Sequence, residues 1–456
     1  MLQKKRYSLQ TKGNICHAFA CWTSSIGKII IKKLKFAKSG LQLQFFYVIL
    51  HPEIQLLLRL IVESFYRTHH YLLSHLPAHI IRRGLMDEIN RNERMIGIKG
   101  SRGIGKTTFL LSYAKEFYGI DNHECLYINL NHFFFTNRTL VEFASDFRSQ
   151  GGKTLLLDQV FKYPEWSKEL HTCYYQFPDL QIIFTGSAVM RLNEDNPDLT
   201  GIVSKYHLRG FSFREYLNLT NDKQFPVYQL KNILQDHFTI AKSINEQMNN
   251  KLLSLFDDYL HHGFYPFFLE NRNFSENLLK TMNMTLEVDV MYIRQIEQRY
   301  LPKLRKLLYR ISLDSPCTPN VSQLSKELEI SRATVMNYIK YLKDARLINF
   351  VYPAGEDYPK KPSTLYIYNT NQIHAVFQEE PINRIKEYKT FFFNQLQKDS
   401  VINEGMQYTD FMINNEFLFC IKENRNFKNN HGYHYAVNID IGEGNMIPLW
   451  LFGFLY

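Results

Sequence analysis

The segment GSRGIGKT, residues 100–107, constrains the fold of this chain more than any other stretch of the sequence. It matches the pattern G-x-x-x-x-G-K-[ST] at every fixed position. It lies between a short apolar run, RMIGIKG, and a helix-like run that ends at Gly119. A phosphate-binding loop needs a strand before it and a helix after it. The alternative, a glycine turn that matches by chance, is much weaker because both flanking elements are expected here.

The glycines and the polar residues of this segment have separate expected roles. Glycines allow backbone angles that other residues rarely adopt, so backbone N–H groups and the start of the following helix can face phosphate groups. Lys106 is expected to reach the β- and γ-phosphates of ATP, and the Thr107 hydroxyl is expected to hold Mg²⁺. The residues predicted to surround the nucleotide are Gly100, Ser101, Arg102, Gly103, Ile104, Gly105, Lys106, Thr107 and Thr108.

A second ligand for Mg²⁺ is expected at the end of a neighbouring strand. The run TLLLD ends at Asp158, which suits that role. The next residue commonly serves as the general base for the attacking water, but Gln159 stands there, and an amide cannot take up that proton. Losing a general base costs roughly 10²–10⁴-fold in rate, while binding survives. The alternative is that Gln159 orients the water, as glutamine does in small GTPases.

The segment FTGSA, residues 184–188, follows the next apolar run and supplies further hydroxyl groups. Thr185 and Ser187 stand where they could sense the γ-phosphate from the end of a strand. We therefore expect Thr185 to take part in catalysis together with Asp158 and Gln159.

Short apolar runs alternate with helical segments between about residues 95 and 210. The runs are RMIGIKG, CLYINL, TLLLD, QIIFTG and KYHLRG. This alternation favours a parallel sheet with helices on both faces, which is the α/β class with a P-loop core. Residues from about 53 to 92 and from about 213 to 300 are predicted to be mostly helical.

The positive charge of the chain is confined to its N-terminal extension. Residues 1–52 contain no Asp or Glu and nine Lys or Arg residues, which accounts for +9 of the net charge of +10. One interpretation is a basic arm for nucleic acid or anionic lipid. The simpler interpretation, which we favour, is a disordered extension.

No stretch of the sequence is predicted to span a membrane. The most apolar segment, residues 45–62, is interrupted by His51, Pro52, Glu53 and Arg59 before it reaches the ~20 apolar residues that a bilayer span needs. The basic start lacks the apolar core of a signal peptide. The six cysteines form no CxxC pair and have no zinc spacing, which indicates reduced thiols. We expect no membrane partner and a cytoplasmic location.

Residues 301–368 predict a winged helix. The apolar positions Leu304, Leu307, Leu308 and Ile311 have helical spacing, a short second helix follows, and Ser331 is a candidate N-cap for a third. In that third helix Val335, Ile339 and Leu342 are expected to point inward. Arg332, Thr334, Asn337 and Tyr338 are expected on an outward recognition face. The runs LINFVYP and TLYIYN would form the wing strands.

Whether this unit contacts DNA is left open by the sequence. Winged helices also serve as dimerisation or packing units, and the outward face carries few positive charges. Binding to DNA is thus the less favoured alternative, beside an oligomer or a protein partner.

Taken together, these segments resemble a family of prokaryotic predicted AAA-type ATPases in the signal-transducing (STAND) branch. The resemblance rests on GIKGSRGIGKTT, LLLDQVFKYPEWSKELHTCYYQFPDLQIIFTGSA, GFSFREYL, YLHHGFYPFF, KPSTLYIYNTN and IPLWLFGFLY, in this order. It implies an ATP- and Mg²⁺-binding core, a helical lid with HGFYP near the nucleotide base, a winged helix, and a C-terminal module like a restriction endonuclease.

The chain departs from this family where catalysis is expected. The family usually has Glu and His where Gln159 and Phe161 stand, and a pair of arginines where Gly201 and Ile202 stand. Arginines there would stabilise transition-state charge, which is worth ~10³-fold or more for an arginine finger. Arg191 and Arg209 are the nearby candidates to replace them.

The C-terminal module departs in the same way. The resemblance implies a metal held by an Asp and a second acidic residue, with a lysine near the attacking water. Asp410 and Lys422 are present, but Cys420 appears at the acidic position, and a neutral thiol is a poor ligand for Mg²⁺. Glu404, Glu416 or Glu423 could substitute only in another register, and we expect an inert packing module that ends in a buried strand, IPLWLFGFLY.

These expectations divide the chain into five parts. They are the extension 1–52, a P-loop AAA-type core with N-terminal helices at 53–235, a helical lid at 236–299, a winged helix at 300–375, and a degenerate nuclease-like α+β module at 385–456. The favoured function is an ATP-binding switch with weak hydrolysis. The alternatives are an active ATPase coupled to DNA binding, and a DNA-binding or defence-type regulator.

Overall fold

The computed structural model describes residues 60–77, 80–192, 194–270, 273–377, 382–427 and 432–456. The basic extension 1–52 lies outside the described residues. Residues 65–456 form one compact unit. Residues 60–74 are helical, but the predicted helix does not continue to residue 92. Pro77 follows shortly after this helix, and the next helix, α3, is the single turn Leu85–Glu88.

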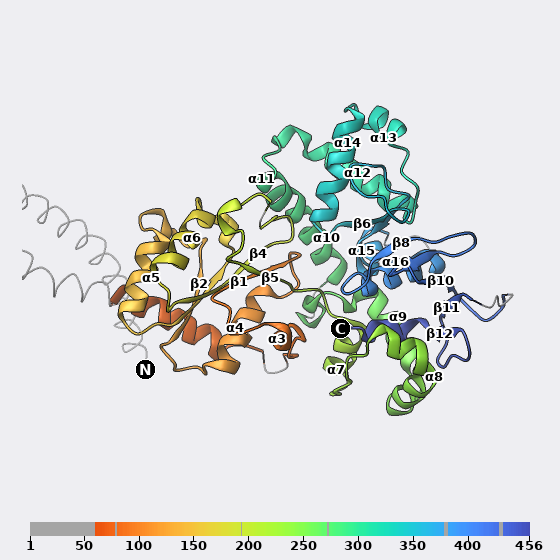
Figure 1. The fold of residues 1–456 in the computed structure, drawn as a ribbon, viewed down its shortest axis with the longest axis horizontal. Coiled ribbons are helices and arrows are strands. Elements are labelled where there is room, and N and C mark those ends of the chain that lie inside the picture. The colour runs from red at the N-terminus through yellow and green to blue at the C-terminus, as the bar shows by residue number, and fades with distance from the viewer. Residues whose placement is uncertain (1–59, 78–79, 193, 271–272, 378–381, 428–431) are drawn as a thin grey trace, which may run out of the picture. The chain divides into compact units, whose positions relative to one another are not determined.

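A parallel five-stranded sheet forms the core, as the alternation of apolar runs predicted (Figure 1). The strand order is β2-β3-β4-β1-β5. The strands are β1 (Met95–Gly100), β2 (Cys125–Asn129), β3 (Thr154–Asp158), β4 (Gln181–Ser187) and β5 (Ser204–His207). Every neighbouring pair is parallel. The carboxyl ends of β1, β3 and β4 therefore meet at one edge of the sheet, where ligands bind in open α/β folds.

Helices α4 (Lys106–Phe117), α5 (Leu140–Ser149) and α6 (Trp166–Gln176) accompany this sheet. Their boundaries follow from local chemistry. Thr139 accepts a hydrogen bond from the Glu142 N–H, and the Glu142 carboxylate accepts one from the Thr139 N–H, so α5 begins with a capping box. Helix α4 packs against β2 and β3, which fixes the loop before it at the end of the sheet.

The chain between residues 213 and 300 is mostly helical, as expected. Its helices are α7 (Phe213–Thr220), α8 (Leu230–Gln247), α9 (Leu252–Asp258), α10 (Phe274–Met284) and α11 (Met291–Ile293). Two π-helical turns interrupt it, at Tyr259–Gly263 and Thr285–Val290, and a 3-10 turn covers Pro266–Glu270. Such π-turns are frequent at functional sites.

Three helices and a two-stranded antiparallel ladder follow. They are α12 (Leu301–Asp314), α13 (Val321–Leu328), α14 (Arg332–Asp344), β6 (Ile348–Val351) and β7 (Thr364–Ile367). Ser331 caps α14 as predicted, and the inward positions Val335, Ile339 and Leu342 are buried. The prediction for Tyr338 was wrong. Its side chain is 5% exposed, because it packs in the same core on the flank of the helix.

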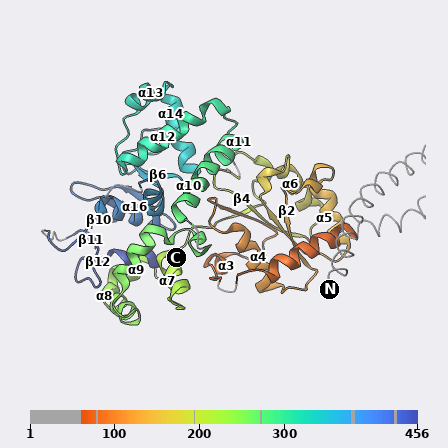
Figure 2. The same ribbon diagram turned by 180° about the vertical axis from the view of Figure 1, so that it is seen from behind.

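The C-terminal part combines α15 (Thr370–Val376) and α16 (Arg384–Leu396) with a second sheet. The sheet order is β12-β11-β10-β9-β8. Its strands are β8 (Ile402–Glu404), β9 (Phe411–Ile413), β10 (Phe417–Lys422), β11 (His434–Val437) and β12 (Met446–Pro448). Figure 2, the view from behind, shows these strands beside α8 and α9, in accord with the contacts between α8 and β12.

The closing segment is buried as expected, but it is not one strand. After β12 the chain forms a 3-10 helix, Leu449–Phe454, whose six residues are all buried. Trp450 Nε1–H donates to the Ile439 carbonyl, and the aromatic side chains pack against α7, α8 and α16. Successive side chains of a strand point to opposite faces, so a strand of consecutive apolar residues must be covered on both faces. A compact helical turn that is surrounded by other elements buries such a run more readily.

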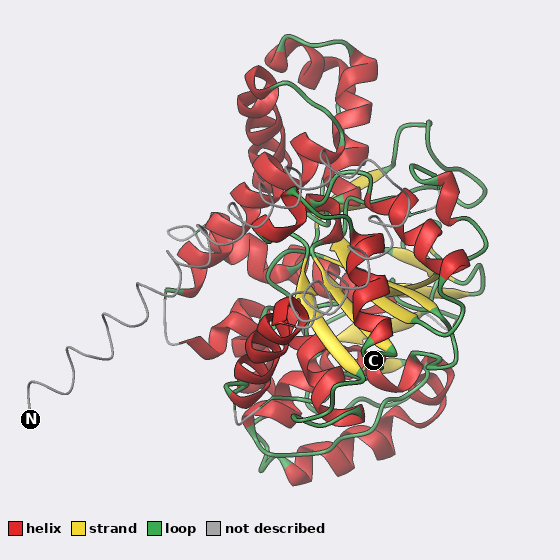
Figure 3. Ribbon diagram, turned by 90° about the vertical axis from the view of Figure 1, so that its left-hand side faces the viewer, coloured by secondary structure: helices red, strands yellow, loops and turns green. Residues whose placement is uncertain are grey.

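Figure 3 distinguishes the strands of the sheets from the helices that surround them. No helix in the described ranges is long and apolar enough to cross a membrane.

Candidate functional site: a phosphate-binding loop and its lid contact

The segment GSRGIGKT forms a tight loop between β1 and α4. Gly103 and Gly105 have φ angles of +81° and +89°, in the left-handed region that favours glycine. Gly100 is needed for a different reason, since a Cβ atom there would lie 2.7 Å from the Leu208 carbonyl oxygen. Ile104 is buried and anchors the loop in the core. The loop thus has the backbone that the motif predicted, immediately before the first turn of α4.

Lys106 lies at the start of α4 and is held against the loop. Its Nζ donates to the carbonyl oxygens of Gly100, at 2.9 Å, and Ser101, at 2.7 Å. Desolvation in the pocket lowers the pKa of Lys106 to about 8, although the carboxylates of Asp289 and Asp158 act to raise it. A desolvated cation at this position is suited to a phosphate group.

Asp158 is the centre of a network of hydroxyl groups at the end of β3. Thr107 Oγ1 donates to its Oδ2 at 2.6 Å, and Thr185 Oγ1 donates to its Oδ1. The Tyr127 hydroxyl donates to Oδ2 at 2.9 Å. The Asp158 side chain is buried. The contact between Thr107 and Asp158 brings together the hydroxyl and the carboxylate that were predicted to hold Mg²⁺, and an oxygen pair of this kind fits that ion.

Tyr127 is a site residue that the motif search missed. Desolvation, and then the charge of Asp158, raise the pKa of its hydroxyl, which keeps it protonated and donating. The sequence did carry a signal, because β2 and β3 run in parallel and Tyr127 lies two residues before Asn129, the partner of Asp158. Tyr127 pairs with Leu156, and Leu156 and Asp158 lie on the same face of β3 because they are two residues apart. The tyrosine side chain is long enough to reach the Asp158 carboxylate.

Gln159 adopts a left-handed backbone conformation, with φ of +57°. Its N–H faces Asp158 Oδ1 at 3.1 Å and Thr185 Oγ1 at 3.2 Å. Within the described residues, its side-chain amide makes no hydrogen bond, and it lines the pocket beside the loop. The side chain is therefore in place to meet a ligand, but it offers no carboxylate.

The loop and Asp158 open into a cavity of about 730 Å³, a size that suits a nucleotide. Pro266, the last residue of HGFYP, and the next residue, Phe267, lie in the 3-10 turn Pro266–Glu270 and line the cavity. Phe267 Cε1 lies 3.1 Å from the position of a Cβ atom on Gly103. Pro266 Cγ lies 3.6 Å from the position of a Cβ atom on Gly105, so the end of HGFYP packs against the loop.

Asp289 connects this site to the second π-helical turn. Its Oδ1 accepts a hydrogen bond from Arg102 Nη2 at 2.5 Å, and its Oδ2 accepts one from the Ser187 hydroxyl at 3.0 Å. The Asp289 carboxylate is almost fully buried. Sequence reasoning did not find this residue, because no motif and no spacing relates it to the loop.

The two arginines considered as replacements for the missing pair lie elsewhere. Arg191 binds Asp344 through Nη2, at 2.5 Å, and Arg209 donates to the Gln397 carbonyl at 3.0 Å. Neither is among the residues that line the nucleotide cavity, and neither are Gly201 and Ile202. Arg102 and Arg83 are the arginines that do line it.

The predicted metal residues of the C-terminal module are engaged with the protein. Asp410 binds Lys389 Nζ at 2.6 Å and accepts the Ile421 N–H at 2.7 Å. Cys420 Sγ donates to the Tyr408 carbonyl, and burial raises the pKa of its thiol. In the described ranges, no three or more His, Cys, Asp or Glu side chains form a cluster that could hold a metal.

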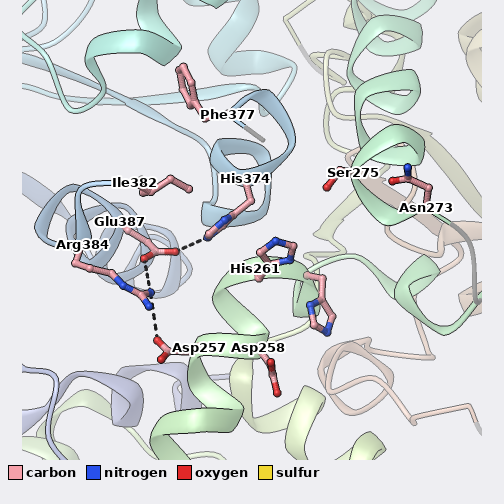
Figure 4. A pocket seen from close by; sticks show the side chains of 11 residues that line it. Asp257, Asp258, His261, Asn273, Ser275, His374, Phe377, Ile382, Arg384 and Glu387 are labelled. Atoms are coloured by element: carbon pink, nitrogen blue, oxygen red, sulfur yellow. Dashed lines mark hydrogen bonds and ion pairs between the residues drawn. The ribbon is translucent and has the colours of Figure 1, made fainter. Parts of the chain in front are cut away.

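A second cavity, of about 910 Å³, lies between α9, α15 and α16 (Figure 4). His374 Nε2 contacts Glu387 Oε1 at 2.6 Å, and Arg384 contacts both Glu387, at 3.0 Å, and Asp257, at 3.3 Å. The rings of His261 and His374 are 4.5 Å apart. The Arg384 guanidinium thus lies between two carboxylates and joins α16 to α9, which indicates a structural network between the helices.

Comparison with known proteins agrees with the class that the fold and the loop define. Residues 92–217 match the family model described as an AAA domain, and this range includes the loop, Asp158 and Thr185. Residues 253–377 match a domain of unknown function, DUF8612. The core thus has the α/β fold of a P-loop domain, and residues 92–217 are similar to AAA domains.

Two relatives come from Methanocaldococcus jannaschii. The uncharacterized protein MJ1637 is 26% identical over 279 residues, which cover 58% of this chain and 58% of that protein. The uncharacterized protein MJ1544 is 23% identical over 299 residues, which cover 60% of this chain and 61% of that protein. The matched region therefore spans about three fifths of the length of each relative.

Solved structures with some likeness include three proteins. The Aeropyrum pernix ORC1 protein in complex with DNA has a TM-score of 0.28 at 9% identity, over 70% of this chain and 92% of that one. AMPPCP-bound DnaA from Aquifex aeolicus has a TM-score of 0.24 at 16% identity, over 57% and 84%. C. elegans PCH-2 has a TM-score of 0.21 at 14% identity, over 64% and 68%.

Proposed function

We propose that this protein binds Mg²⁺ and ATP in the loop cavity and acts as a nucleotide-dependent switch that hydrolyses ATP slowly. The observation that carries the proposal is the position of Asp289. One carboxylate from the predicted lid binds both Arg102 of the loop and Ser187 at the end of β4. A ligand that competes for these two side chains would act directly on the lid.

Binding would use groups that already converge on the cavity. The backbone of residues 101–105 and the Lys106 ammonium would hold the phosphates, and Thr107 with Asp158 would hold Mg²⁺. Bound Mg²⁺ supplies charge neutralisation for the phosphates. Thr185 orients the Asp158 carboxylate through its hydroxyl and also contacts the Gln159 N–H.

Slow hydrolysis follows from the lack of a general base and of a catalytic arginine among the described residues that line the cavity. A water molecule that attacks the γ-phosphate must lose a proton, and the Gln159 amide cannot accept it. Neither Arg191 nor Arg209 lines the cavity to stabilise the transition state. Gln159 can still orient a water molecule, so turnover by that route would persist at a low level.

The switch would operate through exchange of ion-pair partners. Arg102 binds Asp289 in the structure, and a γ-phosphate close to the loop would attract the same guanidinium group. Release of Asp289 would free the turn Thr285–Val290, which packs against α10, α11 and α12. The predicted lid, residues 236–299, and winged helix, residues 300–375, would then respond to the bound nucleotide.

The test is to measure whether Mg·ATP releases this turn. Hydrogen exchange of residues 285–290 should become faster when ATP is added to the full-length protein, and it should return to its original rate when ADP replaces ATP. The same measurement on Lys106→Ala controls for effects of ATP outside the loop. Unchanged exchange in the wild type, with ATP shown to be bound, would contradict the switch.

Contact with DNA through α14 is a second candidate. It is favoured by the order α13, α14 and β6–β7, with Arg332 exposed at the first turn of α14. It is opposed by Tyr358, which donates to Asn337 Oδ1 at 2.8 Å and lies under Lys340 Nζ, 3.7 Å from its ring centroid. The double variant Arg332→Ala/Lys340→Ala should abolish salt-dependent binding to duplex DNA if this face is used.

A further inference from the structure

A third cavity, of about 410 Å³, is lined by four cationic side chains. They are Lys99 of β1, Arg209 just after β5, Lys343 of α14 and Arg346 just before β6. His207 of β5 also lines the cavity, but burial, followed by the charges of Arg346 and Lys99, lowers the pKa of its ring to about 3, which keeps it neutral. We call this hollow the basic cavity. It shares no lining residue with the nucleotide cavity.

The charges in the basic cavity are not balanced by the protein. Among the described residues that line it, the carboxylate is that of Asp344, and this group is already bound by two arginines. Arg191 Nη2 lies 2.5 Å from Asp344 Oδ2, and Arg294 Nη2 lies 3.3 Å from the same oxygen. The exposed Glu194 also acts electrostatically on Lys99. The net charge facing the cavity is therefore clearly positive.

Two of the cations, Arg209 and Arg346, are fixed by hydrogen bonds, and the other two, Lys99 and Lys343, have ammonium groups that can bind a ligand. Arg209 Nη2 donates to the Gln397 carbonyl and Arg346 Nη1 to the Tyr368 hydroxyl, each at 3.0 Å, so both guanidinium groups have a fixed orientation. Lys343 Nζ lies over the Phe350 ring. In the ranges that the structure covers, the ammonium groups of Lys99 and Lys343 make no hydrogen bond or ion pair.

The pKa values of these groups show that their assembly is unfavourable without a counter-charge. Desolvation, and then the Arg346 guanidinium, lower the pKa of Lys99 to about 8, against the smaller opposite effects of Asp344 and Glu194. Desolvation is also the main cause that lowers the pKa of Lys343. The charge of an anion between these groups would act in the opposite direction and raise the pKa of both lysines.

We propose that the basic cavity binds a small phosphate-bearing anion. Paired guanidinium groups with two ammonium groups match the geometry and charge of several phosphate oxygens better than those of a single carboxylate. The buried aromatic side chains of Phe350, Tyr368 and Phe393 form part of the wall. Such a hollow suits a compact ligand rather than an extended nucleic-acid backbone, which follows open grooves.

The location of the basic cavity gives the ligand a means to influence the rest of the molecule. Its lining residues come from the parallel sheet, from α14 and β6, and from α16 and the segment that leads to β8. Lys99 immediately precedes Gly100 of the loop, and Ala188 immediately follows Ser187, a partner of Asp289. A ligand here would join three parts of the chain next to the nucleotide site.

Calorimetry with inorganic tripolyphosphate tests the proposal on full-length protein. The Lys106→Ala background weakens binding at the loop. In that background we expect tripolyphosphate to bind, and the added changes Lys99→Ala and Arg346→Ala to weaken it at least about tenfold. Lys231→Ala, on the exposed surface of α8, should have no effect. Equal affinity with and without Lys99 and Arg346, or no binding at all, would overturn the proposal.

A labelling experiment avoids the chance that these variants fold poorly. An amine-reactive anhydride near pH 8 should modify Lys99 of the wild type, because its pKa is close to that pH. Tripolyphosphate should protect Lys99, as read by peptide mass spectrometry, whereas chloride at equal ionic strength should not. Protection by ATP at lower concentration would identify a nucleotide as the source of the phosphate groups. Protection by duplex DNA but not by tripolyphosphate would overturn the proposal.

Discussion

Asp289 lies 2.5 Å from Arg102 Nη2, so a carboxylate 187 residues further along the chain is bound to the phosphate-binding loop. The same carboxylate holds Ser187 at the end of β4. This relationship ties the loop and the end of β4, which both line the nucleotide cavity, to one short helical turn. It is the structural basis for the proposal that a bound nucleotide influences the turn Thr285–Val290.

Replacing Asp289 by Asn should raise the affinity for Mg·ATP. The substitution keeps the shape of the side chain but removes a negative charge near the phosphate site, and it leaves Arg102 free to bind phosphate. A change of about 1 kcal/mol, or roughly fivefold in Kd, is expected for a charge at this range in a partly screened site. Fluorescence titration with a labelled ATP analogue would measure it.

Asp195→Asn is the matched control for that variant. Asp195 also forms an ion pair with an arginine, Arg294, at 2.8 Å, but it does not line the nucleotide cavity. The Asp195→Asn variant should bind ATP with the affinity of the wild type. Weaker ATP binding in Asp289→Asn would show that Asp289 assists the nucleotide rather than competing with it.

Lys106→Ala should lose most of the affinity for ATP. The ammonium group faces the cavity from the first turn of α4, and hydrogen bonds to charged groups contribute about 1.5–3 kcal/mol, which is roughly 10–150-fold in Kd. Lys115→Ala removes an exposed lysine from the last turn of the same helix and should bind ATP normally. Calorimetry compares the two variants. If Lys106→Ala retained full affinity, ATP would have to bind elsewhere.

The sequence predicted the parallel sheet, the loop and Asp158 because each depends on local patterns. Buried strands appear as short apolar runs, and the loop depends on glycines at fixed spacing. Asp289 and the basic cavity could not be predicted, because they bring together residues that are far apart in the chain. The helical form of Leu449–Phe454 and the burial of Tyr338 also depend on the partners that cover them.

Gln159→Glu should increase the rate of ATP hydrolysis. A carboxylate at this position can accept the proton that the amide cannot, and a general base contributes about 10²–10⁴-fold. Gln159→Ala separates the two roles considered for the glutamine. Steady-state phosphate release should be little changed in Gln159→Ala if the glutamine is inert, and much reduced if it orients the water. If Gln159→Glu hydrolysed ATP no faster than the wild type, the site would lack other catalytic groups besides the general base.

Stability should fall as the pH drops from about 6.5 towards 4, in part because of His69. Its Nδ1 accepts the Tyr127 N–H at 3.0 Å, and burial, followed by the charges of His70 and His123, lowers its pKa to about 4. In the unfolded chain the pKa of His69 is near 6.5, so between pH 6.5 and 4 the unfolded state binds a proton that the native state does not bind. This contribution is complete above pH 6.5 and amounts to up to about 3 kcal/mol.

Denaturant unfolding of His69→Gln measures the contribution of His69 to the pH dependence of the unfolding free energy. The loss of unfolding free energy between pH 6.5 and 4 should be smaller than in the wild type, because the titrating group is gone. His75→Gln, at an exposed position just after the helix of residues 60–74, should retain the wild-type dependence. Identical pH dependence in His69→Gln and the wild type would rule out His69 as a source of the acid sensitivity.

The most direct test of the central claim is to measure, on wild-type protein, the Kd for Mg·ATP together with the steady-state rate of hydrolysis. The account predicts that ATP binds and that turnover is slow, well below the usual range of about 1–10³ per second. Rapid turnover would contradict the assignment of a relaxed catalytic site. Failure to bind Mg·ATP would contradict the assignment of the loop itself.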